Sequence, residues 1–224
     1  MNHPFFSKTK KEEIQFQVKI VFIALLFFSI FLIIGWLTKI YFLPFLIFVI
    51  IITVIAPFLD VPSMKDQGKL IYYSNLLITE KPKNNIIKIH GGTLLDYFFV
   101  IKNEWTAKKR RNYILQKYIE GILNLITELE SKKDLDITFR ATTYIINART
   151  ATKIGFHVVD TDIIQKAILM FNYFNLTISN SIVKKKIAFP KLNHIITFEA
   201  TLKDLIAKKP LLIEINKRLD ASYI

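Results

Sequence analysis

The stretch that decides the fold is a pair of apolar runs, IVFIALLFFSIFLIIGWLT at Ile20–Thr38 and IYFLPFLIFVIIITVIAPFL at Ile40–Leu59. The runs contain 19 and 20 residues without a charged side chain, and the single residue Lys39 separates them. A helix rises about 1.5 Å per residue, so each run makes a helix of roughly 28–30 Å, which matches the hydrocarbon thickness of a bilayer. The sequence therefore predicts a transmembrane helical hairpin over residues 20–59.

The residues that flank the two runs predict the orientation of the hairpin. Trp36 and Tyr41 lie at the turn, where amphipathic aromatic side chains favour a membrane–water interface. Against Lys39 alone at the turn, six lysines lie before the first run and after the second: Lys8, Lys10, Lys11, Lys19, Lys65 and Lys69. Positive charge near the ends of a span favours the cytoplasmic side. We therefore predict a two-pass protein of the inner (cytoplasmic) membrane with both termini in the cytoplasm.

The two runs carry no group suited to transport chemistry. Ser29 and Thr53 are their main mid-span polar residues, whereas ion and proton pathways usually need ionisable side chains inside the membrane. We interpret the hairpin as an anchor. A basic start before an apolar run is also typical of a signal peptide, but this run is too long and a second span follows at once. Residues 1–19 are therefore predicted to remain as a basic cytoplasmic tail.

The remainder, residues 61–224, has the length of one domain with a core of its own. The absence of cysteine excludes disulfides, thiolate zinc sites and a cysteine nucleophile. The net charge is +13, but 26 of the 31 basic residues are scattered lysines. Together with abundant Ile and Asn and only 6 Gly, this composition is typical of AT-rich bacterial genomes. We interpret most of the charge as solvated surface, so nucleic acid is not the partner that the sequence favours.

The first half of the domain shows strand patterns followed by a long helix. Short Ile- and Tyr-rich runs predict strands at residues 70–73, 76–79 and 86–89. Thr93 followed by Asp96 predicts a capped short helix through Ile101, with a strand as the alternative. A helix is predicted from Thr106 to about Lys132, with apolar residues spaced 4, 3, 4 and 3 apart: Leu115, Ile119, Ile122, Ile126 and Leu129. This stripe predicts a helix packed on a sheet.

The second half alternates strands and helices, and its first part is most like a βαβ unit. Strands are predicted at residues 137–146, 156–159 and 194–198, and a short helix at 148–154. A further helix is predicted from a cap at Asp160 or Thr161 to about Tyr173, and the pattern of residues 175–193 is ambiguous. Thr201-x-x-Asp204 predicts the start of a terminal helical region. The predicted fold class is a mixed α/β (α+β) domain, with helices packed on one sheet, behind the membrane hairpin.

Sharp catalytic signatures are absent from the sequence. It contains no G-x-S-x-G elbow, Walker loop or dinucleotide fingerprint, and its histidines lack the H-x-x-x-H spacing of a zinc site. We therefore predict no cofactor and no metal, and we assign no family.

A loose group of polar residues remains as a candidate site. Asn147, Arg149 and Thr150 lie at the start of a predicted helix, where free N–H groups favour an anion and Arg149 adds a charged fork. Arg149 with His157 and Asp160 offers material for acid–base catalysis. The alternative is that Asn147 and Asp160 are helix caps and Arg149 is a surface charge.

Four consecutive basic residues, Lys108, Lys109, Arg110 and Arg111, lie in the first turn of the long helix. Cations there are unfavourable because the helix dipole is already positive at that end. We predict that this turn faces anionic lipid headgroups of the inner leaflet, with solvent screening as the alternative explanation.

Two functions from different classes follow. The first is a membrane-anchored, non-enzymatic module at the inner membrane surface that binds a protein or an anionic surface. The second is a membrane-anchored enzyme that acts on a phosphorylated or lipid-linked substrate through the region of Arg149, His157 and Asp160. The lack of any complete motif favours the binding module.

Overall fold

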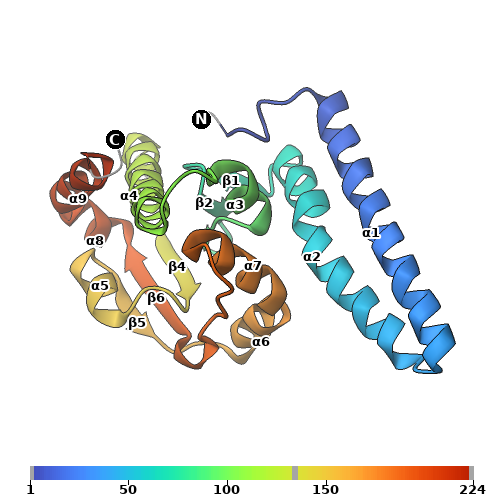
Figure 1. The fold of residues 1–224 in the computed structure, drawn as a ribbon. Helices are drawn as coiled ribbons and strands as arrows, with labels where there is room; N and C mark the ends of the chain where they lie inside the picture. Colours follow the sequence, from blue (N-terminus) through green and yellow to red (C-terminus); the bar gives the residue numbers. More distant parts are fainter. Residues whose placement is uncertain (1–2, 133–135, 222–224) are drawn as a thin grey trace.

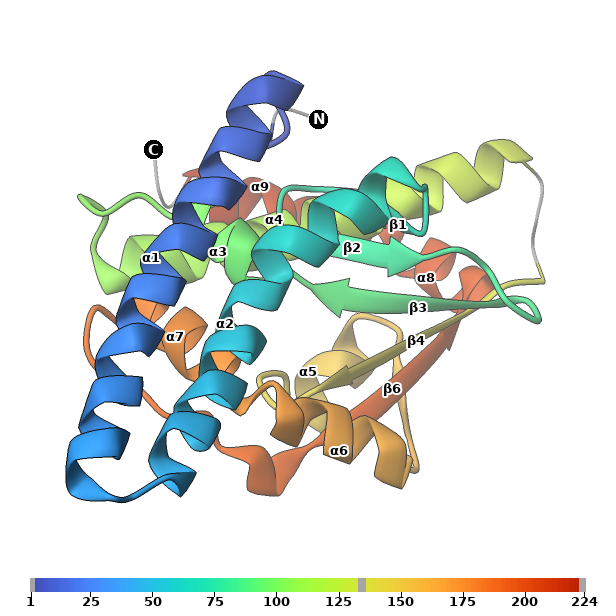
Figure 2. The ribbon, with the colours of Figure 1, turned by 90° about the vertical axis from the view of Figure 1, so that its right-hand side faces the viewer.

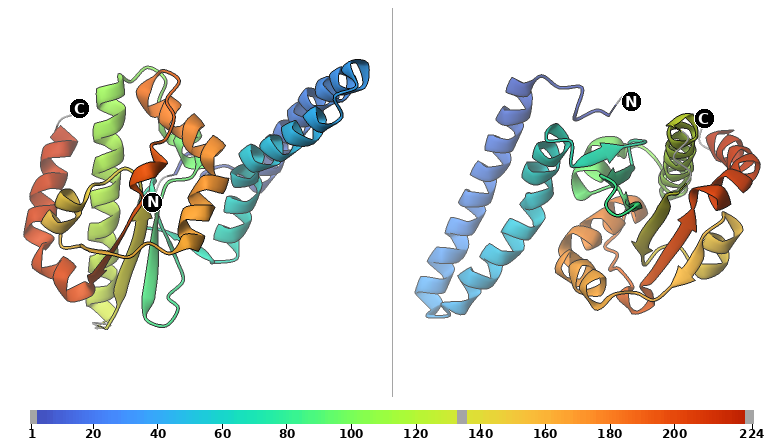
Figure 3. Two further views of the ribbon diagram at one scale, coloured as in Figure 1. Left: turned by 90° about the horizontal axis from the view of Figure 1, so that it is seen from below. Right: turned by 180° about the vertical axis from the view of Figure 1, so that it is seen from behind.

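The computed structural model describes residues 3–132 and 136–221. Two long apolar helices, α1 (Lys10–Thr38) and α2 (Phe42–Asp66), form a hairpin, and a mixed six-stranded sheet with helices packed on it follows (Figure 1). Both helices are long and apolar enough to span a membrane. The predicted fold class is therefore confirmed. Figure 3 shows the hairpin projecting from one side of the domain, with its turn on the side away from the sheet.

The two hairpin helices are in close contact near their turn, through Gly35 and Pro44. Lys39, with φ 62°, ends α1 in the left-handed conformation, and α2 begins three residues later. A Cβ atom added to Gly35 would lie 2.5 Å from Pro44 Cγ, which is closer than any side chain tolerates. Glycine at this position is what lets Pro44 pack against α1.

Pro57 and Pro62 lie inside α2. Each proline lacks the N–H that would bond to the carbonyl four residues earlier, which leaves the carbonyls of Thr53 and Phe58 without a helical donor. Side-chain amides replace those donors. Asn175 Nδ2 donates to Thr53 O at 2.9 Å, and Gln17 Nε2 donates to Phe58 O at 3.1 Å. The helix therefore continues to Asp66 without buried, unpaired carbonyls at these two positions.

The sheet has the strand order β1-β2-β3-β4-β6-β5 (Figures 1 and 2). Its strands are β1 (Leu70–Tyr72), β2 (Leu77–Glu80), β3 (Ile86–Gly91), β4 (Thr138–Thr143), β5 (His157–Val159) and β6 (Ile196–Thr201). β3 and β4 pair in parallel, and the other neighbouring strands pair antiparallel. The predicted βαβ unit is wrong in one respect: β6 lies between β4 and β5, which therefore do not pair with each other.

Helices connect and cover these strands. They are α3 (Leu94–Val100), α4 (Ala107–Lys132), α5 (Ala148–Lys153), α6 (Ile163–Phe171), α7 (Tyr173–Lys184), α8 (Leu202–Ala207) and α9 (Lys209–Ala221), with a short 3-10 turn, η1 (Leu192–His194). The ambiguous segment 175–193 thus forms most of α7 and the start of η1. Asp162 caps α6 by accepting a hydrogen bond from Ile164 N at 3.0 Å, so the predicted cap at Asp160 or Thr161 is wrong by one or two residues.

The main core lies between α4 and the sheet. Four of the five predicted stripe residues are buried there: Ile119, Ile122, Ile126 and Leu129. The fifth, Leu115, is 37% exposed, and at that end of α4 it is Ile114 that is buried, in a second cluster with Leu76 and Tyr97. A Cβ atom on Gly121 would lie 2.6 Å from Leu77 Cβ, so this glycine sets how closely α4 approaches β2.

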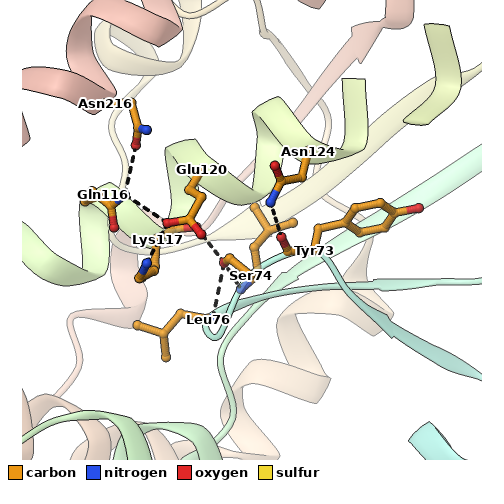
Figure 4. Close-up of polar contacts among 9 residues, drawn as sticks. Tyr73, Ser74, Leu76, Gln116, Lys117, Glu120, Asn124 and Asn216 are labelled. Atoms are coloured by element: carbon orange, nitrogen blue, oxygen red, sulfur yellow. Dashed lines mark hydrogen bonds and ion pairs between the residues drawn. The ribbon is translucent and has the colours of Figure 1, made fainter. Parts of the chain in front are cut away.

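Polar contacts fix the turn between β1 and β2 against α4 (Figure 4). Ser74 Oγ donates to Lys117 O at 2.6 Å and accepts from the backbone N–H of Leu76 and Leu77. Asn124 Nδ2 donates to Tyr73 O at 2.8 Å. These contacts satisfy backbone groups of a tight turn beneath a helix, so they determine where α4 lies on the sheet.

The opposite face of the sheet is charged over β3, β4 and β6. Glu80 lies 2.8 Å from His90 Nε2 and 3.7 Å from Lys88 Nζ. Arg140 forms an ion pair with Glu199, its neighbour in register on β6. The helices therefore cover one face of this part of the sheet, and side-chain ion pairs occupy the other.

Residues 3–8, which we predicted to be part of a tail, pack on the domain. Figure 1 shows this segment running back from the start of α1 over the domain. Phe5 is fully buried in a cluster with Phe58, Val61, Leu94 and Leu95, which come from α2 and α3. The start of the chain and the domain therefore lie at the same end of the hairpin.

Candidate functional site

A cavity with a volume of about 620 Å³ lies where α2 meets the domain. One wall comes from α2, through Ile52, Thr53 and Ala56. The remaining walls come from β2, β6 and the ends of β3 and β4, and from α3, α4, α5, α6 and α7. Figures 1 and 2 show α6 and α7 beside α2 at this place. A helix apolar enough for a bilayer is thus also part of a cavity in the domain.

The cavity lining is mostly apolar and carries little charge. Apolar side chains that face it include Ile89, Ile122, Ile146, Ile154, Phe156, Ile168, Leu169 and Phe198. Asp60 and His90 are the ionisable acid and base in the lining, and among the described residues no lysine or arginine lines it. Such a lining suits an uncharged, largely apolar molecule.

Three tyrosines supply polar atoms without supplying charge. The hydroxyl oxygens of Tyr97 and Tyr118 lie 2.9 Å apart, and burial raises the pKa of both. Burial also raises the pKa of Tyr144 to about 12, and its hydroxyl donates to Asn180 Oδ1 at 3.4 Å. These phenols therefore stay neutral at physiological pH and act as hydrogen-bonding groups of the wall.

Asn175 on α7 is a buried polar residue of the lining whose side chain has one paired and one unpaired end. It is 6% exposed, and its amide nitrogen donates to the Thr53 carbonyl that Pro57 leaves free. Its Oδ1 atom has no hydrogen-bond partner. A buried acceptor without a donor costs free energy, which a ligand with a hydroxyl or amide N–H would recover.

The predicted anion site at the start of α5 has the geometry of a helix cap. Asn147 Oδ1 accepts from Thr150 N at 2.9 Å, so one free N–H of this turn is already occupied. Arg149 and Thr150 are exposed. The helix has only six residues, which limits its dipole. Anion binding by Asn147, Arg149 and Thr150 stays a prediction. In the structure Asn147 caps α5, which is the alternative role that we gave for this residue.

The predicted catalytic residues do not line the cavity. His157 is exposed on β5, in register with Glu199 on the charged side of the sheet. Asp160 is exposed in the connection to α6, and Arg149 is exposed on α5. A catalytic role for these three residues stays a prediction, and the cavity gives it no support.

The predicted basic surface at the start of α4 needs one correction. Arg110 is 3% exposed, and its guanidinium donates to the backbone carbonyls of Asn103 and Ile182. Its guanidinium therefore joins the start of α4 to the end of α7. Lys108 and Arg111 are exposed, and Lys109 lies 5.7 Å from the centre of the Trp105 ring. The prediction is left with Lys108, Lys109 and Arg111.

Sequence reasoning missed the cavity, because its walls are built from residues far apart in the chain. One signal was present: Pro57 leaves a carbonyl in an apolar helix, and a buried polar residue elsewhere is needed to satisfy it. Comparisons of the chain with protein-family models, with curated proteins and with solved structures find no match.

Proposed function

We propose that this protein is a two-pass membrane protein whose domain binds an uncharged lipid-like molecule in the cavity beside α2. The observation that carries this proposal is that a cavity of about 620 Å³ has an apolar, membrane-length helix as one of its walls. A molecule dissolved in the bilayer would reach such a wall without crossing water. The proposal refines the binding module that the sequence favours.

The chemistry of the lining narrows the class of ligand. Its apolar side chains suit an acyl or isoprenoid chain, and the free Oδ1 of Asn175 suits a hydroxyl or amide donor. A phosphate inside the cavity would have no lysine or arginine among the described lining residues. Burying such a charge without a partner is costly. We therefore propose a neutral lipid with a hydrogen-bond donor near its headgroup.

We further propose that the domain faces the cytoplasm. The six lysines at the open end of the hairpin against one at its turn support this orientation. Phe5 packs on Leu94 and Leu95, so the start of the chain and the domain share one side. Lys108, Lys109 and Arg111 would then be available to anionic headgroups, each contributing on the order of 1 kcal/mol near the surface.

Filling the cavity is expected to remove ligand binding. Ala56 lines the cavity from α2, so Ala56→Trp places an indole ring in the space that the ligand would occupy. We expect the affinity of the full chain, in detergent micelles, for a fluorescent monoacylglycerol to fall at least about tenfold, equivalent to about 1.4 kcal/mol. Titration of fluorescence anisotropy measures it.

The matched control is Leu26→Trp, which adds the same ring to the exposed surface of α1, outside the cavity lining. This variant is expected to bind like the wild type. Equal affinity of the wild type and the Ala56→Trp variant would contradict the cavity as the binding site. Tighter binding of a phosphorylated analogue than of the neutral lipid would contradict the proposed ligand class.

A further inference from the structure

Exposed apolar side chains of the domain gather in one segment. Of the fourteen large apolar side chains beyond Asp66 that are exposed in the described part of the chain, nine lie between residues 163 and 189. They are Ile163, Ile164, Ile168, Met170, Phe171, Phe174, Ile178, Ile187 and Phe189, which we call the α6–α7 face. A water-soluble surface seldom concentrates large apolar groups in this way.

α6 is the centre of this face. Seven of its nine residues are apolar in the sequence IIQKAILMF, yet none of them is buried, and Ile163 is 80% exposed. Met170 lines a groove together with Leu192 and Ile195, so the chain after α7 lies next to α6. The exposed residues therefore belong to neighbouring parts of one surface.

The contact of α7 with α2 shows how far the α6–α7 face lies from the end of the second predicted span. Asn175 binds the carbonyl of Thr53, and this residue lies six positions before Leu59, the end of the second predicted span. At about 1.5 Å per residue, the contact lies about 9 Å inside the span. Amphipathic helices at a membrane surface lie at a comparable depth, about 5–10 Å into the headgroup and acyl boundary.

We infer that the α6–α7 face is immersed in the bilayer boundary and that lipid is what covers it. If the bilayer surface lay at Thr53 instead, only the eleven residues before it in α2 would remain to cross, about 17 Å against a hydrocarbon core of about 30 Å. Immersion of the face lets the hairpin span the membrane and keeps the bond between Asn175 and Thr53.

Basic residues next to the α6–α7 face are consistent with a position at the bilayer boundary. Lys184, Lys185 and Lys186 are exposed at the far end of α7, next to the contacts of Ile182 with Arg110. The exposed side chains of Ile187 and Phe189 follow, with buried Ala188 between them. Basic residues next to immersed apolar groups are typical of interfacial segments, since they contact anionic headgroups while the apolar groups enter the acyl layer.

Depth-dependent quenching tests this inference, and the native chain has no cysteine to interfere. The full chain is labelled with an environment-sensitive fluorophore at Ile164→Cys and reconstituted into vesicles of phosphatidylcholine and phosphatidylglycerol. Some of these lipids carry a nitroxide on the acyl chain. The matched control is Ile213→Cys, an exposed isoleucine on α9, which packs on α4 and not on α2. We expect the label at Ile164 to be quenched at least threefold more than the label at Ile213.

The inference rests on insertion of the hairpin, so a third label at Leu26→Cys, on the exposed surface of α1, reports insertion separately. Quenching at Leu26 with equal quenching at Ile164 and Ile213 would overturn the immersed face and leave the anchor intact. Absence of quenching at Leu26 would overturn both. A blue-shifted emission at Ile164 without quenching would assign the face to a second copy of the chain and would also overturn the inference.

Discussion

Replacing Ile126 with Asp is expected to abolish the cooperative unfolding of the domain. Ile126 is fully buried between α4 and the sheet, among Leu125, Leu129 and Phe139. A carboxylate there would be ionised without a partner or would be forced to protonate, and either outcome costs several kcal/mol. That cost is comparable with the total stability of an ordinary domain, about 5–15 kcal/mol. Differential scanning fluorimetry of the full chain in detergent should then show no sharp transition.

The matched control is the next residue of the same helix. Thr127 is exposed, so Thr127→Asp introduces the same side chain into the same helix without burying it. We expect its Tm to stay within a few degrees of the wild type. Similar Tm values for the two variants would show that α4 does not pack on the sheet through Ile126.

Replacing Asp96 with Ala should lower Tm by roughly 6–20 °C. Asp96 is fully buried, and its carboxylate accepts from Tyr72 Oη at 2.9 Å and from Thr93 N at 2.6 Å. His3 Nε2 lies 3.2 Å away. Phe5 N donates to His3 Nδ1 at 3.3 Å, which holds the ring in place beside Asp96. Removing one member of a buried charged group costs roughly 3–5 kcal/mol, which corresponds to that change in Tm for a chain of this size.

Asp204 provides the control for Asp96, because it forms the same capping box with Thr201 at the start of α8, where both side chains are exposed. Asp204→Ala loses the cap alone, about 0.3–1.5 kcal/mol. The larger effect of Asp96→Ala therefore measures the part of the network that joins the start of the chain to the domain. Equal changes in Tm for the two variants would contradict that network.

The sequence predicted helices well where all the residues that determine the helix lie in one short segment. The capping boxes at Thr93 and Thr201 mark the starts of α3 and α8, and the apolar spacing of α4 identifies its buried side. Each of these depends on residues within a few turns of one another. The uncharged runs of the hairpin likewise needed only length and composition.

Features that depend on distant residues were not predictable. β6 enters the sheet between β4 and β5, and no local pattern encodes that pairing. In the sequence, Arg110 is indistinguishable from the three basic residues beside it. It is buried because its guanidinium donates a hydrogen bond to the carbonyl of Ile182, 72 residues away. The cavity is a further case, because α2 and α7 meet through Thr53 and Asn175, 122 positions apart.

The predicted domain boundary at Val61 stays a prediction, although contacts cross it. Phe5 and Phe58 pack with Val61, Leu94 and Leu95, so residues on both sides of the boundary share one apolar cluster. The sequence separates anchor and domain by composition, whereas the structure joins them by packing. This connection is what places the cavity and the α6–α7 face beside the hairpin.

Cysteine accessibility tests the central claim, a hairpin that crosses the membrane with both termini in the cytoplasm. Lys39 lies at the hairpin turn and Lys203 is exposed on α8, so Lys39→Cys and Lys203→Cys sample the two predicted sides in a chain without native cysteine. In intact bacterial cells, a membrane-impermeant maleimide should label Lys39→Cys, and should label Lys203→Cys only after permeabilisation. Labelling of Lys203→Cys in intact cells, with Lys39→Cys protected, would contradict the claim.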